Sequence, residues 1–188
     1  MTRRLPQVTA RRTVSENRFL TYVEEDLLDR HQKPYTYYQV EAKFDAVLVL
    51  PILPDGRLLL ERIYRHPYRR YFLEFPAGGI EPGEAPLHAA SRELAEETGY
   101  RAGTLTSLGS YEAMPGLLRM RLHVVLAQEL TAGEQVRHDA MEMLELAPMT
   151  VLEAWQHADA EASSSFLVVG LLYYQRHLAR ESRASPGT

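Results

Sequence analysis

The chain has 188 residues, 45% of them hydrophobic, which is enough for one packed domain with a small addition. Its formal net charge of −4, with 21 Lys and Arg against 25 Asp and Glu, disfavours a general nucleic-acid binder. It contains no cysteine, which excludes disulfides, thiol catalysis and thiolate-bound zinc or iron.

The first 40 residues predict a small β unit ahead of the main domain. Apolar and polar residues partly alternate over residues 13–28, which is typical of a two-stranded hairpin, and residues 33–34 would end this unit. The expected organisation is a β unit over residues 1–40, a main domain over residues 41–181 and a loose tail over residues 182–188.

A nearly all-aliphatic segment, residues 45–53, predicts a central strand that is buried on both faces. Pro54, Asp55 and Gly56 supply turn residues after it, and an Asp-Gly pair between apolar runs is typical of a β-hairpin. Further strands are expected over residues 35–41, 57–64, 71–75, 105–111, 121–130 and 143–146.

The apolar period becomes helical over residues 86–98. Leu87, Ala90 and Leu94 fall on one stripe, and Gly99 follows as the expected C-terminal cap. Pro86 suits only the first turn of a helix, so it marks the beginning.

Two more helices are expected near the C-terminus, over residues 151–158 and 165–180. The apolar run at residues 166–174 is too short for a membrane span, and the N-terminal segment lacks the apolar stretch of a secretory signal. We therefore expect a cytoplasmic protein without a membrane partner. Strands interrupted by well-marked helices predict an α/β sandwich with helices on both faces of a mixed sheet.

Three acidic residues gather on one side of the expected helix over residues 86–98. Glu96 and Glu97 lie three and four residues after Glu93, so all three project opposite the apolar stripe. Like charges at this spacing destabilise a helix by roughly 0.2–0.5 kcal/mol per pair, so helix stability does not select them. Clustered carboxylates are the hard oxygen ligands that magnesium takes, whereas a solvated acidic face is the alternative interpretation.

The residues around this helix follow a longer pattern at fixed spacing. The pattern consists of Gly78, five residues, Glu84, seven residues, Arg92, Glu93, Leu94, one residue, Glu96, Glu97, one residue, Gly99 and Tyr100. It resembles the signature box of the Nudix hydrolase family, with Tyr100 in place of the usual aliphatic residue. Because so many positions agree, the metal-binding interpretation is favoured over a solvated face.

The resemblance implies the Nudix α/β/α sandwich and hydrolysis of a diphosphate linkage with Mg²⁺, for which Mn²⁺ is an alternative. The implied metal ligands are the carbonyl of Ala77 and the carboxylates of Glu93, Glu96 and Glu97, with Glu96 also a candidate base. Arg92 would orient Glu93, and Glu84 would brace the loop or join the metal shell through water. Water would attack one phosphorus without a covalent protein nucleophile.

Over residues 14–178 the chain looks like the branch that hydrolyses ADP-ribose and other nucleoside diphosphate sugars. The N-terminal β unit, residues 74–78 and Pro115 carry this similarity. It implies that a nucleotide sugar is cleaved to a nucleoside monophosphate and a sugar phosphate and that the protein is a homodimer. The charge balance adds the expectation that no nucleic acid is bound. The implied substrate-binding residues are Arg65, Glu74, Gly78 and Pro115.

Two of these roles have structural alternatives. Tyr or Phe residues between positions 19 and 38 are candidates for stacking on the base, but a role in the core or sheet would also explain them. Arg65 matches an arginine that contacts phosphate in the family, yet with Arg62, Arg69 and Arg70 it would equally suit a solvated strand edge.

One position departs from the family pattern, which places a catalytic glutamate four residues beyond the glycine of a Pro-Gly pair. Here Met120 follows Gly116 at that spacing, and methionine cannot accept a proton. The candidate bases are therefore Glu112, Asp139, Glu142 and Glu145, unless Glu96 or Glu97 suffices. Two alternative functions remain. The first is a catalytically weak Nudix module that senses a nucleotide sugar, and the second is a pyrophosphatase for a dinucleotide, NADH or a coenzyme A derivative.

Overall fold

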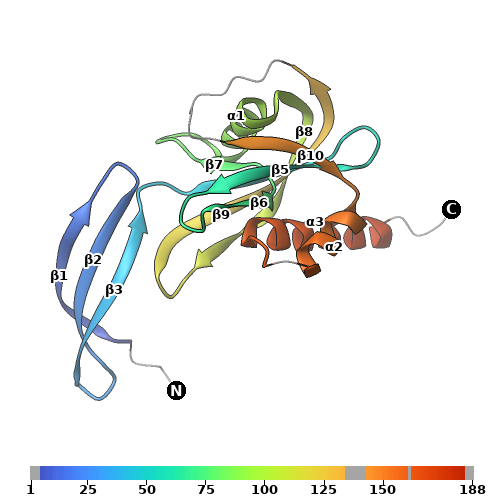
Figure 1. Cartoon of the computed structure of the whole chain (residues 1–188). Helices are drawn as coiled ribbons and strands as arrows, with labels where there is room; N and C mark the ends of the chain where they lie inside the picture. Colours follow the sequence, from blue (N-terminus) through green and yellow to red (C-terminus); the bar gives the residue numbers. More distant parts are fainter. Residues whose placement is uncertain (1–4, 134–142, 161, 185–188) are drawn as a thin grey trace. The chain divides into compact units, whose positions relative to one another are not determined.

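A computed structural model describes residues 5–133, 143–160 and 162–184, and these residues divide into two units (Figure 1). Unit 1 comprises Met1–Asp45 and Glu112–Arg121, and unit 2 comprises Ala46–Tyr111 and Leu122–Thr188. The chain thus leaves unit 1, returns to it for one short segment and ends in unit 2. The boundary expected between residues 40 and 41 stays a prediction.

Unit 1 is an antiparallel sheet in the order β1-β2-β3. Its strands are β1 (Gln7–Glu16), β2 (Leu20–Leu28) and β3 (Pro34–Ala42). The expected hairpin is confirmed, and Asn17 closes its turn by accepting hydrogen bonds from the N–H groups of Phe19 and Leu20 at 2.8 and 2.9 Å. The expectation that residues 33–34 end this unit is wrong, because β3 pairs with β2 along its whole length.

The returning segment of unit 1 pairs with β3 as well. At the beginning of β9 (Leu118–Ala132), Leu118 and Arg119 pair in parallel with Val40 and Glu41. The main-chain N–H of Arg121 then donates to the carboxylate of Asp45 at 3.1 Å. Unit 1 is therefore held together across two separate stretches of the chain.

Unit 2 contains strands of two sheets. In the mixed sheet, β4 (Ala46–Pro51) lies between β9 and β7 (Ala77–Gly79), and β8 (Tyr100–Met114) pairs with β9. The antiparallel sheet has the order β10-β5-β6 and consists of β5 (Leu58–Arg65), β6 (Arg70–Glu74) and β10 (Leu144–Met149).

The turn after β4 forms as expected, but a hairpin does not follow it. Gly56 adopts a φ of 84°, which suits glycine, and its N–H donates to the carbonyl of Leu53 at 2.9 Å. Only one bridge, between Ile52 and Leu58, then joins the two arms. The hairpin prediction is wrong beyond this turn, because β9 and β7 already occupy both edges of β4.

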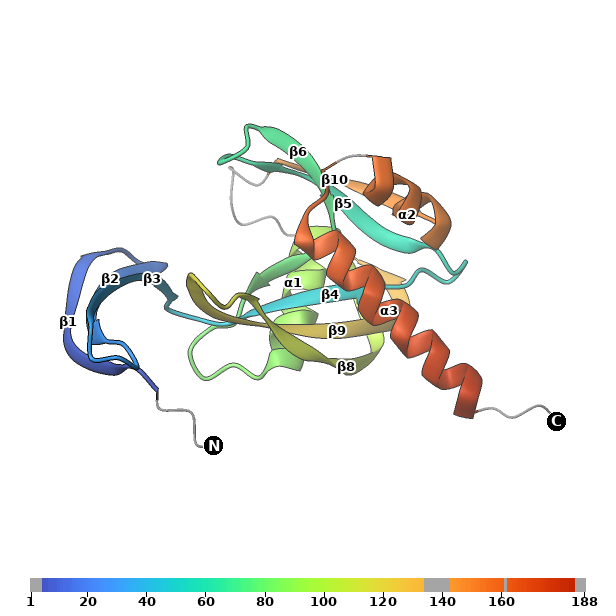
Figure 2. The same ribbon diagram turned by 90° about the horizontal axis from the view of Figure 1, so that it is seen from below.

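Helices cover both faces of β4, as Figure 2 shows. The helix α1 (Pro86–Thr98) packs on one face, where Ala90 and Leu94 meet Val47 and Val49. The helix α3 (Ser165–Ala184) packs on the other, and α2 (Val151–Ala160) contacts α3 and β10. This arrangement confirms the expected α/β sandwich. Because α3 continues through Ala184, residues 182–184 are helical and not part of a loose tail, and residues 185–188 lie outside the described part of the chain.

The helix α1 has the predicted bounds. Pro86 stands in its first turn, and Gly99 caps its end with a φ of 75° and an N–H bond to the carbonyl of Ala95 at 3.0 Å. Leu87 departs from the predicted stripe, since it remains 38% exposed while Ala89 is buried instead. Within the described ranges, no helix has the length and apolar composition that a bilayer crossing requires.

Candidate metal and diphosphate site

Arg92 is the centre of an ionic network on α1. Its guanidinium donates to both carboxylate oxygens of Glu84, at 3.1 and 2.9 Å, and to Glu93 Oε1 at 2.7 Å. It also donates to the carbonyl of Gly79 at 2.8 Å and to Glu96 at 3.2 Å. These bonds hold the carboxylate of Glu93 in one orientation and fasten the loop before α1 to the helix.

Glu84 organises this loop through a second contact. Its Oε2 accepts a hydrogen bond from the N–H of Glu81 at 3.0 Å. The hydrogen bond from Arg92 is the main reason why the pKa of Glu84 lies below its usual value, and Glu84 in turn is the first cause of the raised pKa of Arg92. Glu84 and Arg92 are therefore both charged at neutral pH.

Gly78 leaves room for the carboxylate of Glu93. A β carbon at position 78 would lie 2.0 Å from Glu93 Cδ and 2.1 Å from its Oε1, closer than any real contact. The place of the Glu93 carboxylate beside β7 therefore depends on glycine at this position.

Glu97 lies deeper in the same region. It is only 5% exposed, and its Oε2 accepts a hydrogen bond from the N–H of Ala77 at 3.0 Å. The structure thus brings together Ala77 and Glu97, two of the residues for which a metal-binding role was predicted.

By its chemistry the donor set suits a hard divalent cation. Glu93, Glu96 and Glu97 provide carboxylate oxygens and Ala77 provides a carbonyl, which are the ligands that magnesium takes. In the side-chain arrangement of the described residues, no three His, Asp or Glu side chains converge into a cation site, and Arg92 engages two of these carboxylates. The ligand role of these residues stays a prediction.

Arg65 and Glu74, both predicted to bind substrate, are paired with each other in unit 2. Arg65 donates through Nε and Nη2 to the same oxygen of Glu74, Oε2, at 3.2 and 2.5 Å. The guanidinium carbon of Arg65 also lies 5.7 Å from the ring centre of Phe166. Arg65 is therefore not part of a solvated strand edge, unlike the exposed residues Arg62, Arg69 and Arg70.

Glu61 is a functional candidate that sequence reasoning missed. It is 0% exposed and lies directly opposite Glu74 in the β5–β6 register. A lone acidic residue in the otherwise aliphatic first half of β5 was the signal that could have revealed it, because a charge is rarely buried there without a purpose.

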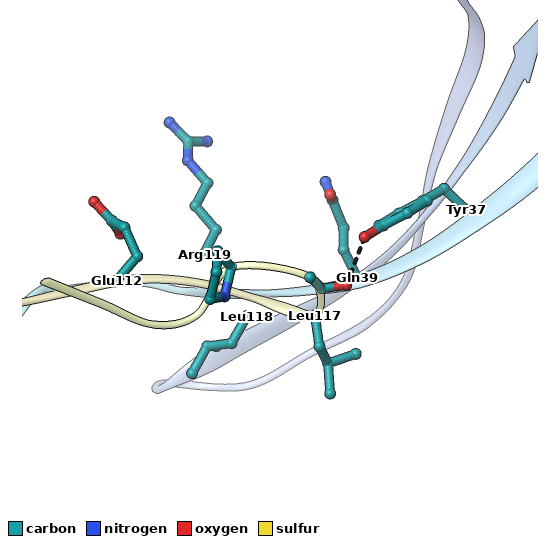
Figure 3. Close-up of a pocket in the computed structure, with 8 residues that line it drawn as sticks. Tyr37, Gln39, Glu112, Leu117, Leu118 and Arg119 are labelled. Carbon is teal, nitrogen blue, oxygen red and sulfur yellow. Dashed lines mark hydrogen bonds between the residues drawn. The ribbon is translucent and has the colours of Figure 1, made fainter. Parts of the chain in front are cut away.

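Unit 1 contains a hollow of about 400 Å³ (Figure 3). Its lining residues are Tyr37, Gln39, Glu112, Pro115, Gly116, Leu117, Leu118 and Arg119. The hydroxyl of Tyr37 donates to the carbonyl of Gly116 at 2.5 Å. Figure 3 shows the polar side chains of Gln39, Glu112 and Arg119 on one side of the strands and Leu117 on the other. The structure thus places Pro115 beside an aromatic residue of the predicted set.

The candidate bases are dispersed. Glu112 lies in unit 1 and forms an ion pair with Arg121 at 3.0 Å, whereas Glu145 is exposed on β10 opposite Arg62. Glu142 and Asp139 lie outside the described residues. The identity of the base stays a prediction.

The part of the chain that contains this site matches a known protein family. The model of the NUDIX domain matches residues 42–167, which is more than half of the chain and includes the whole box. The chain belongs to the Nudix family. This membership confirms the resemblance drawn from Gly78, Arg92 and the glutamates of α1.

Several individual proteins are similar to the chain. An ADP-ribose pyrophosphatase of Bacillus subtilis (strain 168) is 39% identical over 110 residues, which are 58% of this chain and 60% of that protein. A methanol dehydrogenase activator of Bacillus methanolicus is 33% identical over 132 residues, 69% of this chain and 71% of that protein. The crystal structure of an ADP compounds hydrolase superimposes with a TM-score of 0.87 at 26% identity, covering 97% of this chain and 99% of that one. The match over nearly the whole length confirms the expected Nudix fold.

Proposed function

We propose that this Nudix protein is a divalent-metal-dependent hydrolase of ADP-ribose or a similar nucleoside diphosphate sugar. The products are a nucleoside monophosphate and a sugar phosphate. The observation that carries the proposal is the fixed set of glutamates on α1, in which Arg92 orients Glu93 over Gly78 and Glu97 is anchored to Ala77. The relatives named ADP-ribose pyrophosphatase and ADP compounds hydrolase support this substrate class.

The residues of unit 2 have separate tasks in this reaction. Glu93, Glu96, Glu97 and the carbonyl of Ala77 hold Mg²⁺ or Mn²⁺, which when bound neutralises charge on the phosphate oxygens. Arg65 binds an oxygen of the diphosphate, since guanidinium groups match phosphate geometry. Water adds to one phosphorus, the bridging P–O bond breaks, and a carboxylate base, Glu96 or one of the dispersed candidates, takes the proton of the water.

We propose that the hollow of unit 1, taken by itself, can hold an aromatic base. Tyr37 offers an aromatic ring for a base, and the side chains of Gln39 and Arg119 offer hydrogen-bond donors on the same side. Pro115 contributes an apolar surface to the same hollow. A small nucleotide, rather than a nucleic acid, suits a chain with a net charge of −4.

We further propose that the protein is a cytoplasmic homodimer that associates through unit 1. This small sheet leaves large apolar side chains exposed, namely Val8, Val14, Phe19, Leu20, Tyr35 and Tyr38. Apolar surface of this kind on a small sheet is typical of an interface. Light scattering of the purified chain would give the mass of a dimer, and a monomer at micromolar concentration would contradict this part of the proposal.

A substrate panel tests the proposed activity. The full chain would be incubated with Mg²⁺ and ADP-ribose, other nucleotide sugars, dinucleotides, NADH and a coenzyme A derivative, with product identification by mass spectrometry. We expect the fastest turnover with a nucleoside diphosphate sugar and release of two monophosphates. No turnover of any member would contradict the enzyme, and tight binding without hydrolysis, unchanged in Glu97→Gln, would favour a sensing module instead.

A further inference from the structure

Three buried acidic side chains lie around one guanidinium in unit 2. Glu61 and Glu74 come from neighbouring strands of the antiparallel sheet, and Glu97 comes from α1. All three are at most 5% exposed. Carboxyl groups buried this deeply stay ionised only beside positive charge, because burial removes the water that would otherwise stabilise the charged form. Arg65 provides part of that charge.

Arg65 is fastened to the strand side of this group rather than to α1. Its hydrogen bonds through Nε and Nη2 both go to Glu74, and Glu61 faces Glu74 directly across the two strands. Burial lowers the pKa of Arg65, but Glu74, Glu61 and Glu97 together raise it above its usual value. The charge of Arg65 is therefore felt by Glu97 as well, even though Glu74 accepts its hydrogen bonds.

A guanidinium near a metal-binding carboxylate opposes the metal in two ways. It repels the incoming cation, and it competes for the oxygens of the ligand. A second negative charge beside Glu74 reduces both effects, because it attracts the guanidinium of Arg65 toward the paired strands β5 and β6 and offsets its field at α1. Glu61 provides this charge without being among the predicted ligands.

We propose that Glu61 is a positioning residue that strengthens divalent-cation binding at α1 by keeping Arg65 at Glu74 and away from Glu97. The inference rests on the metal-binding role of α1 in the proposed function. It adds a residue that influences cation affinity without touching the cation, on β5, a strand that carries none of the predicted metal ligands.

Binding of Mn²⁺ alone to the metal-free full chain, followed by calorimetry and by the electron paramagnetic resonance signal of free Mn²⁺, tests this inference without any turnover. We expect Glu61→Gln to weaken binding by about tenfold, as loss of an outer-shell partner commonly does. Arg65→Gln should have the opposite sign and tighten binding. The matched control is Glu181→Gln, which removes an exposed carboxylate of α3 and should leave Mn²⁺ affinity within about twofold of wild type.

The double variant Glu61→Gln, Arg65→Gln should resemble Arg65→Gln, because Glu61 acts through Arg65. Circular dichroism identifies unfolded variants, and Glu61→Leu, which suits a buried strand, replaces Glu61→Gln if the latter does not fold. Unchanged affinity in the folded Glu61 variant, or unchanged affinity in Arg65→Gln, would overturn the inference while the proposed function stands. Failure of the wild-type chain to bind Mn²⁺ would instead overturn the metal site itself.

Discussion

Gly78 and Glu93 approach each other so closely that no side chain fits at position 78 while the carboxylate stays in place. A β carbon there would lie within 2.3 Å of both carboxylate oxygens of Glu93. Gly78 has no left-handed backbone angle, so the requirement for glycine here is one of clearance. The first position of the Nudix box is thereby coupled physically to the first glutamate of α1.

The substitution Gly78→Ala should therefore displace Glu93 and weaken catalysis. We expect kcat/KM to fall by about tenfold or more, since a displaced ligand or its support commonly costs that much. Ser91→Ala, an exposed position on the same helix, is the control and should retain wild-type kinetics. Steady-state kinetics on the best substrate would measure the effect, and an unchanged kcat/KM in Gly78→Ala would show that Glu93 tolerates the movement.

The conservative variants Glu93→Gln and Glu97→Gln test the metal ligands directly. Each removes one negative charge while keeping size and shape, so we expect activity to drop by about 100-fold or more with the fold intact. Circular dichroism and kinetics on the same preparation separate the two effects. A variant that is folded and close to the wild-type rate would refute the role of its glutamate.

The bounds of α1 were predictable because the signals that mark them are local. Pro86 can begin a helix, Gly99 can end one, and the spacing of the glutamates follows from helical pitch. The strands β4 and β5 were also located, but their membership in different sheets was not. Whether β4 and β5 share a sheet depends on which strands occupy the edges of β4. One of these strands is β9, whose position beside β4 could not be predicted because it is distant in sequence.

The candidate site divides in the same way. The pairing of Arg92 with Glu93 was implied by the resemblance to the Nudix box, whereas the burial of Glu61 opposite Glu74 depends on the pairing of β5 with β6. The hollow of unit 1 was only partly foreseen, because Arg119 returns to β3 from a distant part of the chain. Contacts between such distant segments leave no periodic trace in a single sequence.

The Glu84–Arg92 ion pair predicts a pH-dependent contribution to stability. The pKa of Glu84 is lowered from its usual 4.5, mainly by Arg92, so its contribution is fully present above that value. It is lost as the pH falls through the lowered pKa, because both the folded and the unfolded states are then protonated. Thermal unfolding of Glu84→Gln should show a lower Tm than wild type at pH 7, and this difference should shrink in acid below pH 4.5. A constant difference would contradict the pairing.

Gly170 lies on α3, which packs on the face of β4 opposite α1, and has no room for a side chain. A β carbon there would lie 2.4 Å from Phe75 Cδ2, and the Phe75 ring is wholly buried. We expect Gly170→Ala to destabilise the protein by about 1–3 kcal/mol through overpacking, which outweighs the gain in helix propensity. Adding Phe75→Leu should recover part of the loss, since the two sites are in contact. Urea denaturation measures both, and a stabilised Gly170→Ala would contradict this packing.

Unit 1 consists of two stretches of chain, Met1–Asp45 and Glu112–Arg121. They meet where Val40 pairs with Leu118 and where the Tyr37 hydroxyl donates a hydrogen bond to the carbonyl of Gly116. No single cut can therefore release it as a fragment. A graft of this unit onto another Nudix protein must therefore include both stretches. A truncation that removes only the N-terminal strands would remove Tyr37 and Gln39 from the lining of the hollow and expose the edge of β9 that pairs with β3.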